Sequence, residues 1–275
     1  MKCVADPLAD QAIEEIPRVD TLSRADFVRQ YLRPGKPVVI RVADGNFWTM
    51  ERLLAALGDR EVSALRTDGG NLRTSPEAGV HFQRIRLDEV TRALADGADP
   101  GWHVSVPLTE MPAAFTDNMP PPVYCADAPF LRSRVWLAAP GTVTPLHWDM
   151  PRNFLQLAFG HRRVLLYPPL DGLHVYPNAP TSKMPNFSRF DPENPDFEAF
   201  RSAQRARPVR GIIGPGEAMY IPPGWWHHVR SLDTSLAVNF WWGNRVIAAA
   251  WRAAQSYKGL RGLYRREWKD RKSVV

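Results

Sequence analysis

The chain has 275 residues, of which 44% are hydrophobic, 11% aromatic and 23% charged. This composition suits one or two soluble globular domains, and no apolar run approaches the roughly 20 residues that cross a bilayer. The opening MKCVADPLADQAIEEIP lacks the apolar stretch of a secretory signal, and Cys3 and Cys125 are too few for a disulfide framework. We therefore expect a cytoplasmic protein with free thiols and no membrane segment.

The formal net charge of +6 comes from one end of the sequence. From Asn244 onward there are nine Lys and Arg residues against Glu267 and Asp270, so this segment carries +7 and the remainder −1. A nucleic-acid-binding domain would spread its cations over one face of the fold. The pattern favours a solvated basic helix, with binding of an acidic partner as the alternative, and does not favour nucleic acid.

The first third of the sequence mixes helix and strand signals. Ser23 is a suitable N-cap for a helix over Arg24–Leu32, and Thr49 is one for a helix that ends at Leu57. A buried strand is predicted over Pro37–Val42, a second strand over Val80–Arg86 and a third helix over Asp88–Ala95.

From about Arg134 the sequence changes to short strand-like runs separated by turn signals. The predicted strands are Arg134–Ala139, Thr142–Trp148, Phe154–Ala158, Arg163–Tyr167, Val209–Ile213, Ala218–Ile221, His227–Ser231 and Leu236–Trp242. A proline-rich insertion, Pro168–Pro208, interrupts them and contains one predicted short helix near Asp196–Arg201. Eight short strands with one long insertion are typical of a jelly-roll barrel that encloses a pocket.

We predict a mainly β fold of the α+β class, a double-stranded β-helix in a single domain over residues 1–275. Its parts are an α/β elaboration (1–130), a barrel core (131–242, with the insertion 168–208) and a basic helical segment (243–275). In the last part, Val246, Ile247, Ala250, Trp251 and Ala254 give the helix predicted over residues 245–257 an apolar face. This face either forms a homodimer or docks on its own barrel.

The segment Thr144–Phe154, TPLHWDMPRNF, contains a histidine and an aspartate two positions apart. On a strand, His147 and Asp149 point to the same face, while Trp148 points to the other. An imidazole and a carboxylate side by side offer two ligands to a divalent metal, and a second histidine would complete the facial triad of non-haem iron. Taken alone, this pair is a weak signal.

The candidate third ligand lies in Gly214–Leu232, GPGEAMYIPPGWWHHVRSL. The pattern predicts turn, strand, turn and strand. His227 and His228 are adjacent on the last strand and face opposite ways, so at most one of them can join the first two ligands.

Both segments together resemble the JmjC/cupin-like oxygenases, a family that depends on Fe(II), 2-oxoglutarate and O2. The pattern is nearest to the asparaginyl hydroxylase called factor inhibiting hypoxia-inducible factor and its small bacterial relatives. The similarity runs through GTVTPLHWDMPRNFLQLAFGHRRVLLYPP (residues 141–169), the 214–232 segment and LAVNFWW (residues 236–242). PVVIRV, near the start, is also similar to that family's opening.

The resemblance implies that His147, Asp149 and His227 hold the metal, and that His228 faces away, held by a backbone carbonyl. It places Trp241 beside the distal histidine. It also implies that Thr144 binds the distal carboxylate of 2-oxoglutarate, and that Asn153 and Asn239 lie near the metal-bound end of this cosubstrate.

Two positions depart from the family pattern. The lysine that usually pairs with the 5-carboxylate is replaced by Arg162 in the hairpin AFGHRR, and Arg163 takes this role if the register shifts by one. An arginine can also grip a carboxylate, through two parallel hydrogen bonds. A tyrosine that several relatives use for the same carboxylate corresponds to Trp102 or, less directly, Tyr124. For both residues a core role is favoured.

The implied function is hydroxylation of a C–H bond, coupled to conversion of 2-oxoglutarate into succinate and CO2. A protein or peptide side chain is the favoured substrate, and a small molecule of specialised metabolism is the alternative. Lysine demethylation is weaker, because no reader or zinc module accompanies the barrel. A cupin-like protein that binds metal without turnover is the non-enzymatic reading.

Overall fold

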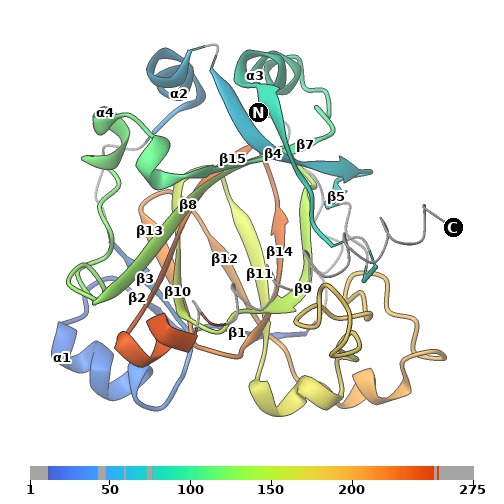
Figure 1. The fold of residues 1–275 in the computed structure, drawn as a ribbon. Coiled ribbons are helices and arrows are strands. Elements are labelled where there is room, and N and C mark those ends of the chain that lie inside the picture. Colours follow the sequence, from blue (N-terminus) through green and yellow to red (C-terminus); the bar gives the residue numbers. More distant parts are fainter. Residues whose placement is uncertain are drawn as a thin grey trace, which may run out of the picture.

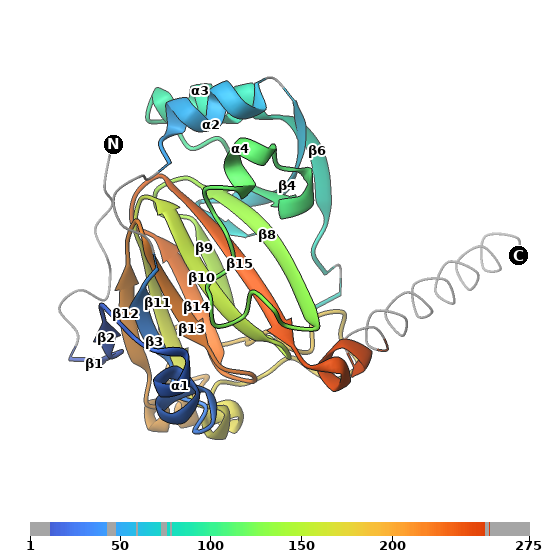
Figure 2. The same ribbon diagram turned by 90° about the vertical axis from the view of Figure 1, so that its left-hand side faces the viewer.

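The computed structural model describes residues 12–42, 48–58, 60–72, 76, 77, 79–250 and 253. Except for one strand that branches off, its strands form one continuous path of hydrogen-bonded neighbours that curves back on itself as a barrel (Figure 1). Helices α2 (Met50–Leu57) and α3 (Leu87–Ala95) lie at one end of the barrel, and α1 (Arg24–Phe27) lies at the other (Figures 1 and 2).

The elements predicted in the first third are present. The side chain of Ser23 accepts a hydrogen bond from the first turn of α1, which continues as a π-helical turn, η1 (Val28–Leu32). Thr49 caps α2 in the same way, and α3 begins one residue before its predicted start. Strand β3 (Val38–Arg41) is buried beside the barrel, and β6 (Phe82–Arg86) precedes α3.

Two long strands, β4 (Glu61–Asp68) and β7 (Trp102–Pro107), are not predicted by the sequence pattern. They connect the two barrel sheets. In one sheet the short strand β5 (Asn71–Leu72) lies between β9 (Val143–Trp148) and β4; β4 pairs with β7, and β7 pairs with β8 (Phe130–Ala138) of the other sheet. Strand β7 is buried on both faces but includes His103 and Ser105, which conceal it from a reading based on apolar runs.

All eight predicted barrel strands form, within a few residues of their predicted bounds. Besides β8 and β9 they are β10 (Arg152–Phe159), β11 (Arg162–Tyr167), β12 (Val209–Ile213), β13 (Glu217–Ile221), β14 (Trp226–Ser231) and β15 (Ser235–Gly243). Antiparallel pairing gives two sheets, in the orders β12-β11-β14-β9 and β8-β15-β10-β13. This is the arrangement of a double-stranded β-helix. The remaining short elements are β1 (Glu14–Glu15), β2 (Arg18–Val19), η2 (Leu108–Glu110) and α4 (Ala113–Thr116).

Side chains alternate between the barrel interior and its outer faces. The interior cluster joins both sheets and includes Leu155, Leu157, Val164, Leu166, Ile213 and Met219. The outer face of the β8-β15-β10-β13 sheet packs on the amino-terminal elements, around Phe27, Phe154 and Phe240. The outer face of the other sheet packs against the insertion through Leu146, Leu165, Tyr167, Val175 and Phe190.

The insertion lies along β9 and contains only short 3-10 turns, η3 (Pro169–Leu173) and η4 (Arg201–Arg205). The short helix predicted near Asp196–Arg201 is displaced to η4. The Asp196 carboxylate accepts hydrogen bonds from two following backbone N–H groups as an N-cap does, but the helical turn ends at Phe200, whose φ of −121° and ψ of 53° are not helical. Next to β9, Trp148 N donates to Asn186 O at 3.0 Å, which brings that part of the insertion to the barrel mouth.

At the carboxyl end, residues 245–250 are helical. Residues 251, 252 and 254–257 of the predicted helix, and most of the basic segment 243–275, lie outside the described residues, as does Cys3. Dimerisation through this helix therefore stays a prediction. Among the described residues, no helix combines the length and the apolar character needed to span a membrane.

Candidate metal centre

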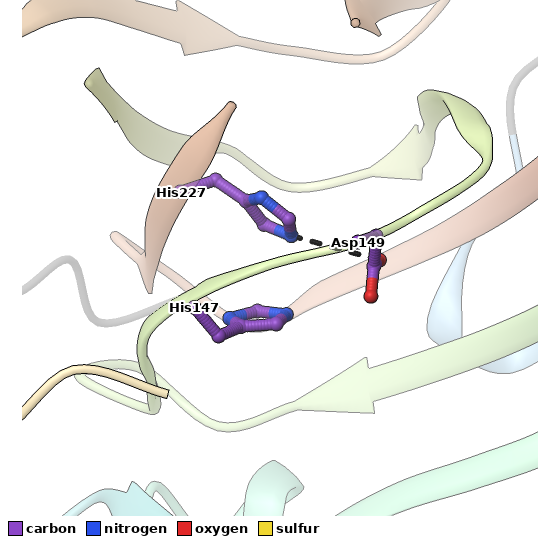
Figure 3. Close-up of side chains that lie close together, drawn as sticks. All are labelled: His147, Asp149 and His227. Atoms are coloured by element: carbon purple, nitrogen blue, oxygen red, sulfur yellow. Dashed lines mark ion pairs between the residues drawn. The ribbon is translucent and has the colours of Figure 1, made fainter. Parts of the chain in front are cut away.

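His147, Asp149 and His227 meet inside the barrel (Figure 3). His147 is on β9, Asp149 directly follows that strand, and His227 lies opposite His147 on β14. Their potential ligand atoms all lie within 4.8 Å of one another, and His227 Nε2 is 3.7 Å from Asp149 Oδ2. Two imidazoles and one carboxylate form the donor set that holds non-haem Fe(II) on one side and leaves the other side open.

Backbone carbonyls orient both imidazole rings. His147 Nδ1 is 2.8 Å from Pro145 O, and His227 Nδ1 is 3.0 Å from Trp225 O. A carbonyl oxygen only accepts hydrogen bonds, so these contacts favour the tautomer with a proton on Nδ1 and a free lone pair on Nε2. Burial, together with the nearby His147, lowers the pKa of His227 to about 4. His227 is thus a neutral imidazole at neutral pH, the form that binds metals.

Trp241 orients the carboxylate of Asp149. Its indole Nε1 donates to Asp149 Oδ2 at 2.8 Å, a contact that the family resemblance did not predict. On the other side, Gly224 N donates to Asp149 O at 3.0 Å from the PPG turn, where Gly224 has a φ of 74°. That left-handed backbone conformation is the one that favours glycine.

His228 faces away from the metal ligands, as strand alternation predicts. Its Nδ1 lies 3.9 Å from Glu193 Oε1 and makes no hydrogen bond within the described part of the chain. At this nitrogen a carboxylate from the insertion lies nearest, so the predicted contact of His228 with a backbone carbonyl stays a prediction. Burial lowers the pKa of His228 to about 4, so this ring is also neutral at neutral pH.

The three candidate ligands line a cavity of about 340 Å³. The same cavity is lined by all four residues expected to bind the cosubstrate, namely Thr144, Asn153, Arg162 and Asn239. Thr144 lies three positions before His147, so strict alternation would turn it to the opposite face. A β-bulge between β9 and β14 shifts the alternation and brings Thr144 into the cavity.

Asn153 and Asn239 form a pair on neighbouring strands. Asn239 Nδ2 donates to Asn153 Oδ1 at 3.0 Å. Asn153 is only 1% exposed, and its own Nδ2 has no hydrogen-bond partner among the described residues. A buried amide donor without a partner costs about 1–3 kcal/mol, so an acceptor oxygen in the cavity would stabilise this arrangement.

Arg162 is a buried cation that faces the same cavity. Its Nε donates to Ser235 Oγ at 3.0 Å and its Nη2 to Trp136 O at 2.8 Å, which fixes the guanidinium. Within the described residues it forms no ion pair. Burial lowers its pKa to about 9, against the opposing effect of Asp233, so Arg162 stays protonated at neutral pH. A carboxylate ligand would supply an ion-pair partner.

Arg163 points to the opposite face of β11 and pairs with Glu193, so the alternative role predicted for it is wrong. The hairpin before β11 determines this register. Gly160 has a φ of 71°, and a Cβ atom there would lie 2.3 Å from Thr234 O, so no side chain fits.

Tyr124 and Trp102 have the packing roles that were favoured. Tyr124 lies in the core against Phe27, and its hydroxyl donates to Leu22 O at 2.8 Å. Trp102 packs under the Arg66 guanidinium, 4.8 Å from the ring centre. Neither residue lines the cavity.

Several lining residues were missed by the sequence analysis. Arg132, Arg134 and Trp136 occupy alternate positions of β8 and face the cavity, beside Asn239 and Trp241 of β15. The alternation in LRSRVW is a signal for such a row, but its meaning depends on the pairing of β8 with β15. The insertion adds Asn186 and Phe187, whose position no local pattern indicates.

Known proteins share this architecture. The Cupin-like domain family matches residues 24–246, most of the chain. The chain belongs to this family. A chain of E. coli ycfD has a similar fold, with a TM-score of 0.50 and 17% identity, over 82% of this chain and 54% of that one. The predicted fold class and the resemblance to JmjC/cupin-like oxygenases are thereby confirmed.

The names of curated proteins similar to this chain describe different activities. The Lysine-specific demethylase JMJ30 of Arabidopsis thaliana is 31% identical over 254 residues, and Lysine-specific demethylase 8 of Danio rerio is 29% identical over 254 residues. These matches cover 89% and 87% of this chain but only 58% and 61% of the two relatives. The tRNA wybutosine-synthesizing protein 5 of Danio rerio is 25% identical over 292 residues, covering 90% of this chain and 86% of that protein.

Proposed function

We propose that this cupin-like chain is an Fe(II)- and 2-oxoglutarate-dependent oxygenase that hydroxylates a C–H bond on a protein or peptide side chain. The observation that carries the proposal is the pairing, in one cavity, of a two-histidine, one-carboxylate cluster with a buried arginine that forms no ion pair within the described residues. A metal alone would not require Arg162, whereas a metal with a dicarboxylate ligand uses both features.

Each residue then has a defined task. His147, Asp149 and His227 hold Fe(II), which with bound 2-oxoglutarate and O2 supplies the oxidation, yielding succinate, CO2 and a hydroxylated product. Arg162 and Thr144 bind the distal carboxylate of 2-oxoglutarate, while Asn153 and Asn239 donate hydrogen bonds near its metal-bound end. Trp241 keeps Asp149 oriented.

A protein substrate is supported by the names of the demethylase relatives and by the openness of the barrel mouth towards a neighbouring groove. A second candidate is a tRNA substrate, since the wybutosine-synthesizing relative matches over 86% of its length. The names of the three relatives given above lend no comparable support to a small-molecule substrate.

The deciding experiment is succinate formation from 2-oxoglutarate by the Fe(II)-loaded chain. We expect turnover by the native chain and loss of at least about 100-fold in His147→Ala, because losing one of three ligands removes the metal. His174→Ala, in the insertion and outside the cavity, is the matched histidine control and should keep its activity. Equal turnover in His147→Ala and the native chain would refute the site.

A further inference from the structure

The mouth of the cavity carries two cations without carboxylate partners. Arg132 and Arg134 line the cavity, and neither forms an ion pair within the described residues. Arg132 is exposed, while Arg134 is half-buried and donates from Nε to Ser105 Oγ at 2.8 Å. Burial and the like charge of Arg132 lower the pKa of Arg134, against the smaller opposing effect of Glu110. The two guanidinium groups therefore reinforce each other's positive potential.

Strand register ties both arginines to the metal centre. Arg132 lies opposite Trp241, the residue that donates to Asp149, and Arg134 lies opposite Asn239. Directly opposite residues on antiparallel strands are about 5 Å apart at Cβ. The guanidinium of Arg134 is also held 4.9 Å above the ring of Phe82, another residue that lines the cavity. The cations thus border the space that a substrate must enter.

The charges of the proposed cofactors do not neutralise these arginines. Asp149 is the sole carboxylate among the described residues that line the cavity, and in the sum of charges it is offset by the cation of Arg162, with which it forms no ion pair. Fe(II) and the 2-oxoglutarate dianion also cancel each other. Arg132 and Arg134 are left as excess positive charge next to the reacting atoms, where a lysine or arginine side chain would be repelled.

The arginines also join the cavity to a second groove. This groove, of about 480 Å³, is lined by both arginines together with Leu108, Thr109, Leu131 and Ser133, among others. Apart from the shared pair it has no cation within the described residues, whereas a nucleic acid backbone would require a continuing basic track. Its mixture of apolar and hydroxyl side chains suits the residues that flank a peptide's target side chain.

We propose that the substrate is an acidic peptide segment, whose Asp or Glu carboxylates are recognised by Arg132 and Arg134 at the mouth of the cavity. The inference rests on the proposed function for where the substrate enters. It sets this chain apart from a lysine-directed enzyme, because the mouth selects the opposite charge.

Peptide binding to the full chain tests this inference without turnover. Two fluorescent peptides that differ only in Glu or Lys at the central and flanking positions are titrated by anisotropy. We expect the acidic peptide to bind about tenfold more tightly, with a preference that weakens as salt is added. Arg132→Glu should remove this preference and favour the basic peptide. Since Arg132 is exposed, the fold should tolerate the change. Arg29→Glu, exposed and on η1, is the control that should keep the native preference.

The outcomes separate the two proposals. Acidic selectivity without succinate formation by the Fe(II)-loaded chain would support the anionic mouth and refute the oxygenase. Succinate formation with equal binding of both peptides would overturn the acidic-substrate inference and leave the oxygenase standing. Single-stranded RNA that binds in an Arg132-dependent manner, while the acidic peptide does not bind, would overturn the peptide as occupant. The peptide would also be overturned as occupant if free glutamate displaced the fluorescent peptide at the same concentration as the unlabelled peptide does.

Discussion

Strands β11 and β14 carry two like pairs of residues that face opposite ways. Arg162 and His227 face the cavity, whereas Arg163 and His228 face the insertion. All four are at most 3% exposed, so burial does not distinguish them. The difference is in the carboxylates. On the outside, Glu193 pairs with Arg163 and Arg230 and lies beside His228. On the inside, Arg162 has no such partner within the described residues.

The comparison separates structural charges from ligand-binding charges. Removing a guanidinium from water costs several kcal/mol unless hydrogen bonds and an opposite charge offset it. The outer cluster supplies both from the protein, and in doing so fastens the insertion to the barrel. The inner arginine has hydrogen bonds but no ion-pair partner among the described residues, and Asp233 does not offset its burial, so a bound anion would remove an unfavourable term.

Of the substitutions considered, Arg162→Met should have the largest effect, on the KM for 2-oxoglutarate. Methionine fills a similar space without charge, so we expect the unfolding free energy to stay equal or rise. The KM for 2-oxoglutarate should rise on the order of several hundredfold, since a buried charge pair contributes about 3–5 kcal/mol once one partner is in place. Urea unfolding and succinate assays measure the two quantities. Arg162→Lys, the usual family residue, should restore most of the affinity.

An unchanged KM in Arg162→Met, with normal unfolding, would mean that the carboxylate is held elsewhere. A large loss of stability in the same variant would mean that Arg162 belongs with the structural charges. Either result would contradict the distinction between a ligand-binding arginine on the inner face and a structural arginine on the outer face.

Arg163→Met should lower the stability and leave the KM for 2-oxoglutarate unchanged, which is the opposite of Arg162→Met and a smaller effect. It leaves Glu193 paired with Arg230 alone, so we expect a loss of about 2 kcal/mol in the unfolding free energy. The KM for 2-oxoglutarate should remain close to the native value because Arg163 does not line the cavity. Arg41→Met, which breaks the exposed pair with Asp20, is the control and should cost less than about 1 kcal/mol. A raised KM with native stability would contradict the assignment.

Much of the inner face was predictable because it depends on local patterns. Alternation located the eight barrel strands, and the HxD spacing placed His147 and Asp149 on one face before any fold was known. The choice of His227 over His228 and of Arg162 over Arg163 came from the family resemblance, since alternation alone leaves both pairs open.

The outer face and the mouth were not predictable, because they depend on contacts between distant segments. Glu193 lies 30 residues from Arg163 and 37 from Arg230, in an insertion without periodicity. Arg132 and Arg134 gain their meaning only from the pairing of β8 with β15. The bulge that turns Thr144 inward is likewise a property of two strands together, so a single-strand pattern would place that residue outside.

The pH dependence of stability gives the smallest and most specific test. Burial alone would raise the pKa of Glu193, but the hydrogen bond from Arg230, the protonated form of His228 and the charges of Arg163 and Arg230 outweigh it and hold the pKa below the usual 4.5. A carboxyl group with a lowered pKa in the fold stabilises it fully above the unfolded pKa and loses this effect as the pH falls through the folded value. We therefore expect Glu193→Gln to be less stable than the native chain at neutral pH, with a difference that shrinks below about pH 4.5.

Urea unfolding of both chains across this pH range measures that difference. Arg162→Met supplies the contrast from the inner face, because its substitution removes no protein carboxylate and should show no comparable change below pH 4.5. A difference between Glu193→Gln and the native chain that stays constant down to acid pH would mean that Glu193 acts through its shape and hydrogen bonds. The outer cluster would then be held by packing, and the contrast between paired and unpaired arginines would lose its electrostatic basis.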